Sequence, residues 1–436
     1  MARIRIVCIL FLFFAGSHTV WASPDIKNWS LDNGARVLFV ESHDLPMVQL
    51  SLVFDAGSAR DPKGKAGLAT LTAGMLEEGT VLRDADTIAR DFESQGAEFG
   101  ASASRDMLTL SLRSLSDKQY LQSALDVFRD VTINPVFPEK SFQRERGRML
   151  IGLRRAHESP GTVAEEAFFK KLFGDHPYAN PPTGTEASVS TLQRQELEDF
   201  HKQYFVGANA LVTIVGDLSQ REAKKLVEDL IADLPKGKAA PAIAETPATV
   251  QGSVTHQDFT SSQSHIYAGV RGIYRGDPDY FPLYVGNYIL GGGGLVSRLA
   301  QEIREKQGLS YSAYSYFYPM KRRGPFILGL QTRNDQRDKA LALLRKTLKD
   351  FVDKGPTAKE LDAAKKNLTG GFALRIDSNR KIAGYLNVIG FYGLPLTYLN
   401  DFIGRIEAVT LKQIHDAFKR RIDPDNLVVV SVGGEA

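Results

Sequence analysis

Arg304 and Tyr311 are two residues of types that could assist a reaction at a carbonyl group. They stand seven residues apart, where a predicted helix ends and a predicted strand begins. A fixed guanidinium and a phenol hydroxyl can stabilise the negative charge that develops on a carbonyl oxygen. Judged by residue type alone, a solvated helix arginine and a packed strand tyrosine would be the commoner arrangement. The pair therefore needs support from the rest of the chain.

The histidines and the single cysteine provide no local motif for a metal site. Two imidazoles that share one helix face must be three or four residues apart. No two histidines beyond the N-terminal leader have this spacing, and they are His43, His157, His176, His201, His256, His265 and His415. Cys8, the one cysteine, lies within the leader, which excludes disulfides, thiol catalysis and cysteine-bound zinc elsewhere. A zinc site built from distant residues is the remaining alternative, and His176, in a GDHPY turn, is expected to be structural.

The first residues have the pattern of a secretory signal peptide. Arg3 and Arg5 make a basic start, residues 6–15 form an apolar run, and residues 20–22 (VWA) offer a cleavage site. The run is shorter than the about 20 residues that span a bilayer, although a retained anchor is the alternative. We expect residues 1–22 to be a cleaved signal peptide. An exported chain without disulfides suits a bacterial periplasm.

The composition is that of an ordinary globular protein. The chain has 54 basic and 51 acidic residues, a net charge of +3 and 43% apolar residues. No basic tract or basic-aromatic motif indicates nucleic acid, and no stretch after the leader is apolar enough for stable membrane insertion. The roughly 410 residues that follow the leader exceed the size of one typical domain and are sufficient for two.

The two halves of the chain share an order of elements that indicates a duplicated unit. Residues 191–216 predict a helix followed by an apolar strand, and residues 410–433 predict the same pair. The offset is roughly 217–219 residues, about half of the chain. Strands occur in hairpin-like pairs rather than in regular β–α–β alternation. The fold class is therefore α+β, with two homologous lobes that each pack helices on one face of a mostly antiparallel sheet.

A segment without periodicity separates the halves. Residues 235–249 are rich in proline and alanine, which is typical of a linker. We expect an N-terminal lobe at residues 23–234 and a C-terminal lobe at residues 250–436.

Short motifs along both halves occur in the order found in one known family. They are residues 33–37 (NGARV), 55–61 (DAGSARD), 67–69 (GLA), 134–137 (NPVF), 174–178 (GDHPY), 215–217 (VGD), 291–299 (GGGGLVSRL) and 304–311 (REKQGLSY). With them the chain resembles the pitrilysin/insulinase-type zinc metallopeptidases, or inverted zincins, over essentially its whole length. The resemblance implies two related lobes that form half or the whole of a clamshell chamber around an unfolded peptide.

The positions that bind zinc in the resembling family carry residues that cannot bind it here. Active members have H-x-x-E-H on the helix after the GLA segment, where the imidazoles bind zinc and the carboxylate takes a proton from the attacking water. In this sequence those positions are Thr70, Ala73 and Gly74. The family's third ligand, a glutamate, falls at Ile151 or Gly152. The resemblance implies an inactive-type chain that binds no metal itself.

Arg304 and Tyr311, in contrast, match the family's substrate-contact pair. The resemblance implies that they hydrogen-bond the substrate backbone near the scissile carbonyl. It also implies a substrate-lining role for the glycine loop, where a peptide backbone could approach closely, at Gly291, Gly292, Gly293 and Gly294. Three tyrosines alternate along the next predicted strand and either line the chamber or pack within the fold, namely Tyr314, Tyr316 and Tyr318.

The loss of every metal ligand beside a retained contact pair favours a non-catalytic subunit. Such a chain would form a heterodimer with a homologous zinc-bearing peptidase subunit and lend it Arg304 and Tyr311 for binding unfolded peptides. The zinc would then belong to the partner, and no peptidase activity is expected from this chain alone. A non-enzymatic peptide-binding or scaffold protein is the alternative, and a self-sufficient peptidase with an unorthodox metal site is the third hypothesis.

Overall fold

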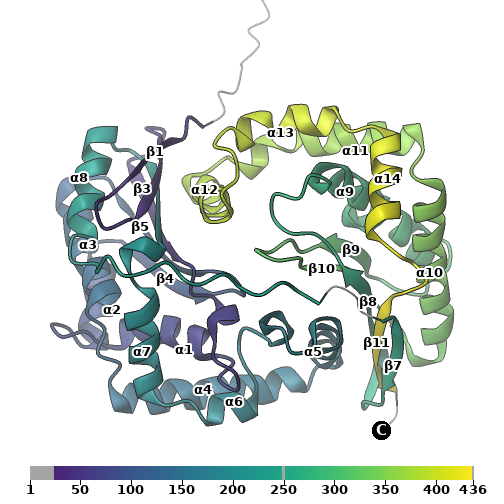
Figure 1. The fold of residues 1–436 in the computed structure, drawn as a ribbon, viewed down its shortest axis with the longest axis horizontal. Coiled ribbons are helices and arrows are strands. Elements are labelled where there is room, and N and C mark those ends of the chain that lie inside the picture. Colours follow the sequence, from purple (N-terminus) through teal and green to yellow (C-terminus); the bar gives the residue numbers. More distant parts are fainter. Residues whose placement is uncertain (1–23, 248–250, 435–436) are drawn as a thin grey trace, which may run out of the picture.

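The computed structural model describes residues 24–247 and 251–434, which form two lobes side by side (Figure 1). The expected signal peptide, residues 1–22, lies outside the described residues. Across the described ranges, no helix is long and apolar enough to cross a membrane.

Each lobe contains one sheet and a set of helices. The strands of the first lobe are β1 (Lys27–Ser30), β2 (Arg36–Glu41), β3 (Met47–Phe54), β4 (Glu98–Ala103), β5 (Leu108–Leu115) and β6 (Ala210–Gly216). Its helices are α1 (Leu68–Met75), α2 (Ala85–Ser94), α3 (Lys118–Ile133), α4 (Glu139–His157), α5 (Pro160–Phe173), α6 (Glu186–Ser190), α7 (Arg194–Tyr204) and α8 (Gln220–Leu230).

The second lobe has the same two kinds of element. Its strands are β7 (Ser253–Gln257), β8 (Ser261–Arg271), β9 (Ala313–Phe317), β10 (Pro325–Arg333) and β11 (Val428–Gly434). Its helices are α9 (Tyr280–Asn287), α10 (Arg337–Lys354), α11 (Ala358–Gly370), α12 (Asn379–Tyr392), α13 (Tyr398–Glu407) and α14 (Leu411–Arg421). Two π-helical segments, Tyr288–Gly292 and Ala300–Glu305, lie between α9 and β9.

Apart from the edge strand β1 of the first sheet, which has no counterpart in the second, the two sheets share one topology, as the internal repeat predicts. The first has the strand order β1-β2-β6-β3-β5-β4 and the second β7-β11-β8-β10-β9. In each, the strand late in the sequence, β6 or β11, lies parallel to one neighbour and antiparallel to the other. Two further strand pairs are antiparallel in both sheets. They are β3·β5 and β4·β5 in the first sheet, and the equivalent β8·β10 and β9·β10 in the second. The repeated helix–strand pairs are α7–β6 and α14–β11, although α7 begins at Arg194, slightly later than expected.

Residue alternation divides the first sheet between two cores. Phe39 and Ile214 point to the core that α1, α3 and α7 complete, while Leu38 and Leu211 belong to the core shared with the second lobe. Successive strand side chains point to opposite faces, so one strand serves both cores. The predicted two-lobed α+β fold is therefore confirmed.

Each sheet also receives a helix from the other lobe on its second face (Figure 1). From the second lobe, α12 packs on β6, β3 and β2, where the Arg36 guanidinium donates to the Gly390 carbonyl at 2.8 Å. In return, α5 of the first lobe packs on β11 and β8, where Phe168 lies 6.1 Å from the ring of Tyr267. Each sheet therefore has helices of its own lobe on one face, as predicted. The other face is covered by α12 or α5 from the opposite lobe, and this exchange joins the lobes into one body.

A buried carboxylate joins the lobes at their centre. Asp106 Oδ1 accepts a hydrogen bond from the Tyr178 hydroxyl at 2.6 Å. Its Oδ2 accepts from the Tyr392 hydroxyl at 2.9 Å and from the Lys321 backbone N–H at 2.7 Å. Because two of these donors belong to the second lobe, the carboxylate is satisfied only when the lobes are together. The same contact raises the pKa of both tyrosines, after the larger effect of burial.

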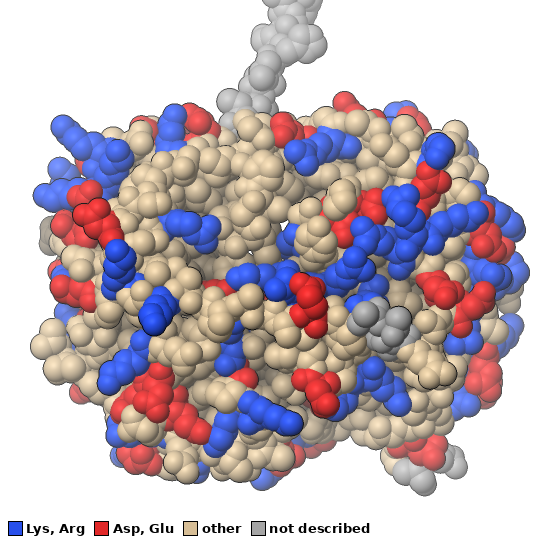
Figure 2. Space-filling model, in the orientation of Figure 1, with Lys and Arg blue, Asp and Glu red and all other residues tan. Residues whose placement is uncertain are grey.

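The segment that joins the lobes runs between them rather than away from them. The Arg60 guanidinium, which also binds Asp55, donates to the Pro241 carbonyl at 2.6 Å. His176 Nε2 donates to the Ala244 carbonyl at 3.0 Å, and its Nδ1 accepts from the Tyr178 N–H at 3.1 Å. His176 is therefore a structural histidine, as its turn predicts. Acidic and basic side chains are interspersed over the face in Figure 2, with a denser group of basic ones across its middle.

Candidate functional site

The helix that would carry the zinc motif is retained as α1. Its first residue follows Gly67, whose φ of 97° lies in the left-handed region that glycine adopts without strain. Asp61 closes this end of the helix, because its carboxylate accepts the N–H groups of Gly67 and Ala69, each at 2.8 Å. Burial raises the pKa of Asp61 to about 7 against the lowering effect of these bonds. The apolar residues of α1, such as Leu71, pack in the core of the first lobe.

The degenerate metal positions do not form a ligand site. The Thr70 hydroxyl donates to the Pro182 carbonyl at 2.6 Å, so its oxygen is engaged in the fold. Ala73 is 2% exposed and fills the core. Gly74 is exposed, and a Cβ added there would meet nothing within 4 Å. The helix therefore keeps its packing but presents no nitrogen or carboxylate to a metal.

The third ligand position is equally unsuited to a metal. On α4, which packs beside α1, Ile151 is 62% exposed, and Gly152 faces open space. Carboxylates are present nearby, but Arg144 binds Glu78 and Glu145. Within residues 24–247 and 251–434, no group of three or more His, Cys, Asp or Glu side chains could hold a metal ion. The described residues therefore offer no set of ligands that could hold a zinc ion and its activated water.

Arg304 and Tyr311 are brought together by a turn. Arg304 lies in the π-helical segment Ala300–Glu305, and its Nη1 donates to the Tyr311 carbonyl at 3.2 Å. Tyr311 precedes β9 and its side chain is 81% exposed, so it is not the packed strand residue that its type suggested. Leu295 and Val296 are exposed as well, and the Val296 carbonyl accepts a hydrogen bond from Gln301 of the same segment. We call residues 294–311 the tip of the second lobe. They present a phenol, apolar side chains and a 38% exposed guanidinium, which also binds Glu305 at 3.3 Å.

The glycine loop leads into this tip. A Cβ at Gly291 would lie 2.4 Å from the backbone nitrogen of Ser315, so glycine is required there by the close approach of β9. Gly294, with a φ of 63°, has open space around it. Gly291 thus has a packing role inside the fold, whereas Gly292 and Gly294 are exposed and a substrate backbone could reach them. The substrate contacts expected for Gly291, Gly292, Gly293 and Gly294 stay a prediction.

The tyrosines of β9 contribute to packing as well as to the surface. The ring of Tyr314 lies over Gly329 of β10, where a Cβ would come within 2.4 Å of it, and it stacks on Tyr316 at 5.9 Å. Burial, followed by the nearby carboxylate of Glu165 on α5, raises the pKa of Tyr316. Tyr318 is half-buried beside α5. Tyr316, which remains 36% exposed, is the member of the set that is open to solvent.

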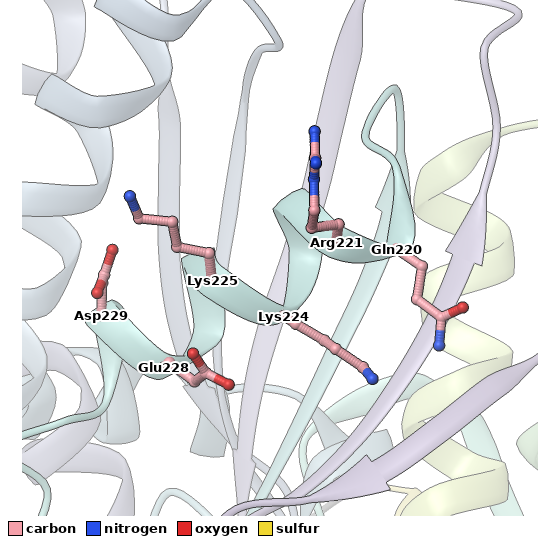
Figure 3. A pocket seen from close by; sticks show the side chains of 6 residues that line it. All are labelled: Gln220, Arg221, Lys224, Lys225, Glu228 and Asp229. Atoms are coloured by element: carbon pink, nitrogen blue, oxygen red, sulfur yellow. The ribbon is translucent and has the colours of Figure 1, made fainter.

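A hollow on the surface of α8 does not have the features of a reaction site. This shallow hollow of about 660 Å³ lies along α8. The side chains that line it fan out from this single helix (Figure 3). They are the charged or polar residues Gln220, Arg221, Lys224, Lys225, Glu228 and Asp229. No two elements bring functional groups together there, so it is a solvated helix face.

Comparison with known proteins assigns the family. Residues 36–186 match the family described as insulinase (peptidase family M16), and residues 191–368 match the peptidase M16 inactive domain. The chain is 30% identical to a Helicobacter pylori protein named non-peptidase homolog YmxG, over 92% of each chain. The chain belongs to peptidase family M16. The predicted resemblance is confirmed, and the absent ligands make this M16 chain an inactive, peptidase-like member.

Other M16 relatives agree with the fold. A Bacillus subtilis protein named uncharacterized zinc protease YmxG is 24% identical over 94% of this chain and 99% of its own. A crystal structure of a peptidase M16 inactive domain from Pseudomonas fluorescens matches with a TM-score of 0.91 and 40% identity, covering 94% of this chain and 98% of that one. A Helicobacter pylori protease structure matches with a TM-score of 0.86 at 19% identity, over 95% and 100% of the chains, which shows the shared fold.

Sequence patterns did not identify several residues of this M16 chain that have unusual surroundings in the structure. No sequence motif contains Asp106 together with its donors Tyr178 and Tyr392, because these residues are brought together from both lobes. Gln49 has a buried side-chain oxygen without a hydrogen-bond partner among the described residues. The alternation of leucine with Thr109, Ser111 and Arg113 in β5 could have indicated a polar sheet face, but not the helix that covers it.

Proposed function

We propose that this chain is the non-catalytic subunit of a heteromeric M16 peptidase. It would pair with a zinc-bearing homologue and supply Arg304 and Tyr311 to the peptide substrate. The observation that carries this proposal is the contrast within one fold: α1 presents Thr70, Ala73 and Gly74 where ligands are needed, while Tyr311 stands 81% exposed beside a guanidinium.

The surface around Arg304 supports this function better than a packing role. A tyrosine that only stabilised the fold would be at least half-buried, as Tyr314 is. Tyr311 instead leaves its hydroxyl and ring available, and the exposed Leu295 and Val296 lie in the same tip. Exposed apolar side chains beside a polar pair are typical of a surface that another chain or a peptide covers.

The chemistry of the proposed complex follows from the two side chains. The partner subunit would hold zinc, which polarises the scissile carbonyl and activates a water molecule. Arg304 and Tyr311 would hydrogen-bond the peptide near that carbonyl and stabilise the charge that develops on its oxygen. Removing one such donor typically lowers the rate about 10²–10³-fold. The periplasm, reached through the expected signal peptide, is the proposed location.

The decisive experiment is reconstitution with a zinc-bearing M16 homologue from the same genome. We expect a stable complex by size-exclusion chromatography and cleavage of an unfolded peptide by the complex. Arg304→Ala and Tyr311→Phe should each lower kcat/KM at least about 10-fold while the complex still forms. Arg333→Ala and Tyr274→Phe are matched controls, because both residues are exposed elsewhere on the second lobe.

One result would contradict the role of Arg304 and Tyr311, and two others would identify a different function. Unchanged activity in Arg304→Ala and Tyr311→Phe would show that the pair is not lent to the substrate. A chain that stays monomeric beside its homologue but binds unfolded peptides would be the peptide-binding scaffold. Stoichiometric zinc with chelator-sensitive cleavage by the chain alone would establish a self-sufficient peptidase.

A further inference from the structure

The face of the first sheet beneath α12 is apolar at one end and polar at the other. At the apolar end, Leu211 of β6 packs closely against Gly390 of α12, where an added Cβ would lie 2.7 Å from its methyl groups. At the other end, β5 places Thr109, Ser111 and Arg113 on this face. Its alternate leucines, Leu108, Leu110 and Leu112, point to the opposite core. A recess of about 390 Å³ remains between α12 and this polar end, which we call the inter-lobe recess. Its volume lies in the roughly 300–1,000 Å³ range of small-ligand pockets.

Side chains of both lobes carry the charge of the inter-lobe recess. Glu98 of β4 binds Arg113 Nη2 at 3.0 Å and Arg380 Nη2 of α12 at 2.8 Å. Two guanidinium groups therefore share one carboxylate, and both are part of the lining. Arg113 and Arg380 are 41% and 65% exposed, so the N–H donors that Glu98 does not accept face solvent, where a ligand can reach them. The surplus of positive charge and of donors favours an anionic ligand group.

Gln49 of β3 offers a hydrogen-bond acceptor to the recess, whereas the arginines offer donors. Its side chain is 5% exposed and lines the inter-lobe recess. The Nε2 atom lies 3.5 Å from the Leu112 carbonyl, at the limit of a hydrogen bond, and Oε1 has no partner among the described residues. An unpaired buried amide oxygen is destabilising, because it has lost its hydrogen bonds to water without gaining a replacement. Oε1 itself is not accessible to solvent, so the Gln49 amide must turn toward the recess before an N–H or O–H of a ligand can satisfy it.

Asn387 and Gly384 complete the α12 side of the recess. The Thr213 hydroxyl donates to Asn387 Oδ1 at 2.6 Å, so the N–H groups of Asn387 are what it offers to a ligand. Gly384, one turn away, is exposed to open space, with no atom within 4 Å of an added Cβ. The helix thus bounds the recess without filling it.

We propose that the inter-lobe recess binds a carboxylate that has an N–H donor close to it, as in a free amino acid or the C-terminal residue of a peptide. The carboxylate would take a guanidinium fork from Arg113 or Arg380, in exchange for part of the Glu98 contact. The N–H donor would satisfy Gln49 Oε1. The recess lies on the face of the sheet opposite α1, and it uses neither Arg304 nor Tyr311. The site is therefore independent of the proposed pairing with a zinc-bearing subunit.

Calorimetric titration of the mature chain without a partner tests this site. The probes are Ala-Ala-Ala with a free C-terminus, the same tripeptide as its C-terminal amide, and alanine. We expect the free tripeptide to bind, and the amide to bind at least about 10-fold more weakly because it cannot accept a guanidinium fork as an anion. Alanine binding as tightly as the tripeptide would identify free amino acids as the ligand. Weaker alanine binding would identify peptide ends.

Two matched variants locate the binding. Gly384→Leu places a side chain in the inter-lobe recess and should weaken the tripeptide at least about 10-fold. Gly404→Leu makes the same change at another exposed helix position with open space, on α13, and should bind as the unaltered chain does. Arg113→Gln should weaken binding of the free tripeptide but not of the amide. Failure of every carboxylate probe to bind, equal binding of acid and amide, or full binding to Gly384→Leu would each overturn the proposal.

Discussion

Arg304 Nη1 donates a hydrogen bond to the backbone carbonyl of Tyr311 at 3.2 Å, across the turn between a π-helical segment and β9. The two side chains that the sequence singled out are thereby held in one local structure. The arginine positions the backbone of the tyrosine, while the phenol ring itself stays in solvent. A pair fixed in this way can meet a substrate without first being ordered.

The first prediction concerns this turn. Arg304→Ala should increase amide hydrogen exchange in the segment between Arg304 and Ala313, because the side chain that holds the Tyr311 carbonyl is lost. The free energy of unfolding should change by less than about 1 kcal/mol, since the bond is partly exposed. Arg333→Ala, whose partner is the adjacent Asp335, should leave the exchange of this turn unaltered. Equal exchange in both variants would mean that Arg304 does not order the turn.

The second prediction concerns the carboxylate that joins the lobes. Asp106→Ala should lower the free energy of unfolding by about 3–5 kcal/mol, because it leaves two tyrosine hydroxyls and the Lys321 N–H without their acceptor. Tyr392→Phe, which removes one donor and leaves Asp106 two, should lower it by about 1–2 kcal/mol.

Urea unfolding of these variants measures both changes. Tyr274→Phe, at a 38% exposed tyrosine, is the control and should alter the free energy of unfolding by about 0.5 kcal/mol or less. A change below about 1 kcal/mol for Asp106→Ala would contradict the role given to this carboxylate.

The third prediction uses two glycines of the α1 region. Gly74→Ala should raise the free energy of unfolding by about 0.5–1 kcal/mol, because alanine is the better helix former and its methyl group meets open space. Gly67→Ala should lower it by at least about 1 kcal/mol, because φ is 97° and the new Cβ would lie 3.0 Å from the Thr183 carbonyl oxygen. Thermal and urea unfolding of the two variants should move in opposite directions.

The fourth prediction concerns pH and a buried histidine. His201 Nε2 donates to the Thr132 carbonyl at 2.8 Å, and burial lowers the pKa of His201 to about 4 from the usual 6.5. The unfolded chain therefore binds a proton near pH 6.5 that the folded chain does not accept until about pH 4. The stability that neutral His201 contributes is fully present above pH 6.5 and is lost as the pH falls to about 4. The loss should reach up to about 3 kcal/mol.

The comparison of the unaltered chain with His201→Gln isolates this effect. Glutamine can keep a donor for the Thr132 carbonyl but does not titrate in this range. The free energy of unfolding should then fall less steeply between pH 6.5 and 4 in the variant than in the unaltered chain. Parallel curves for the two proteins would show that His201 does not cause the pH dependence.

Much of the fold followed from local patterns. The apolar strands at residues 210–216 and 428–434 occupy equivalent places in two sheets of one topology, as their shared order with a preceding helix predicts. Periodicity shows which faces are apolar, but not which distant segment covers them. The exchange of α12 and α5 between the lobes therefore could not be predicted, and neither could the recess that α12 leaves above Gln49.

The sequence by itself determined that the zinc site is lost. The motif needs two imidazoles that bind zinc and a carboxylate that acts as the base, and no fold can supply these groups from Thr70, Ala73 and Gly74. Only the tertiary structure decided how the retained residues are presented. Exposure depends on what the rest of the chain covers, and so Tyr311 lies in solvent while Tyr314 packs over Gly329. The unpaired oxygen of Gln49 is likewise a property of its surroundings, because burial and the absence of a donor arise only when β3, β5 and α12 meet.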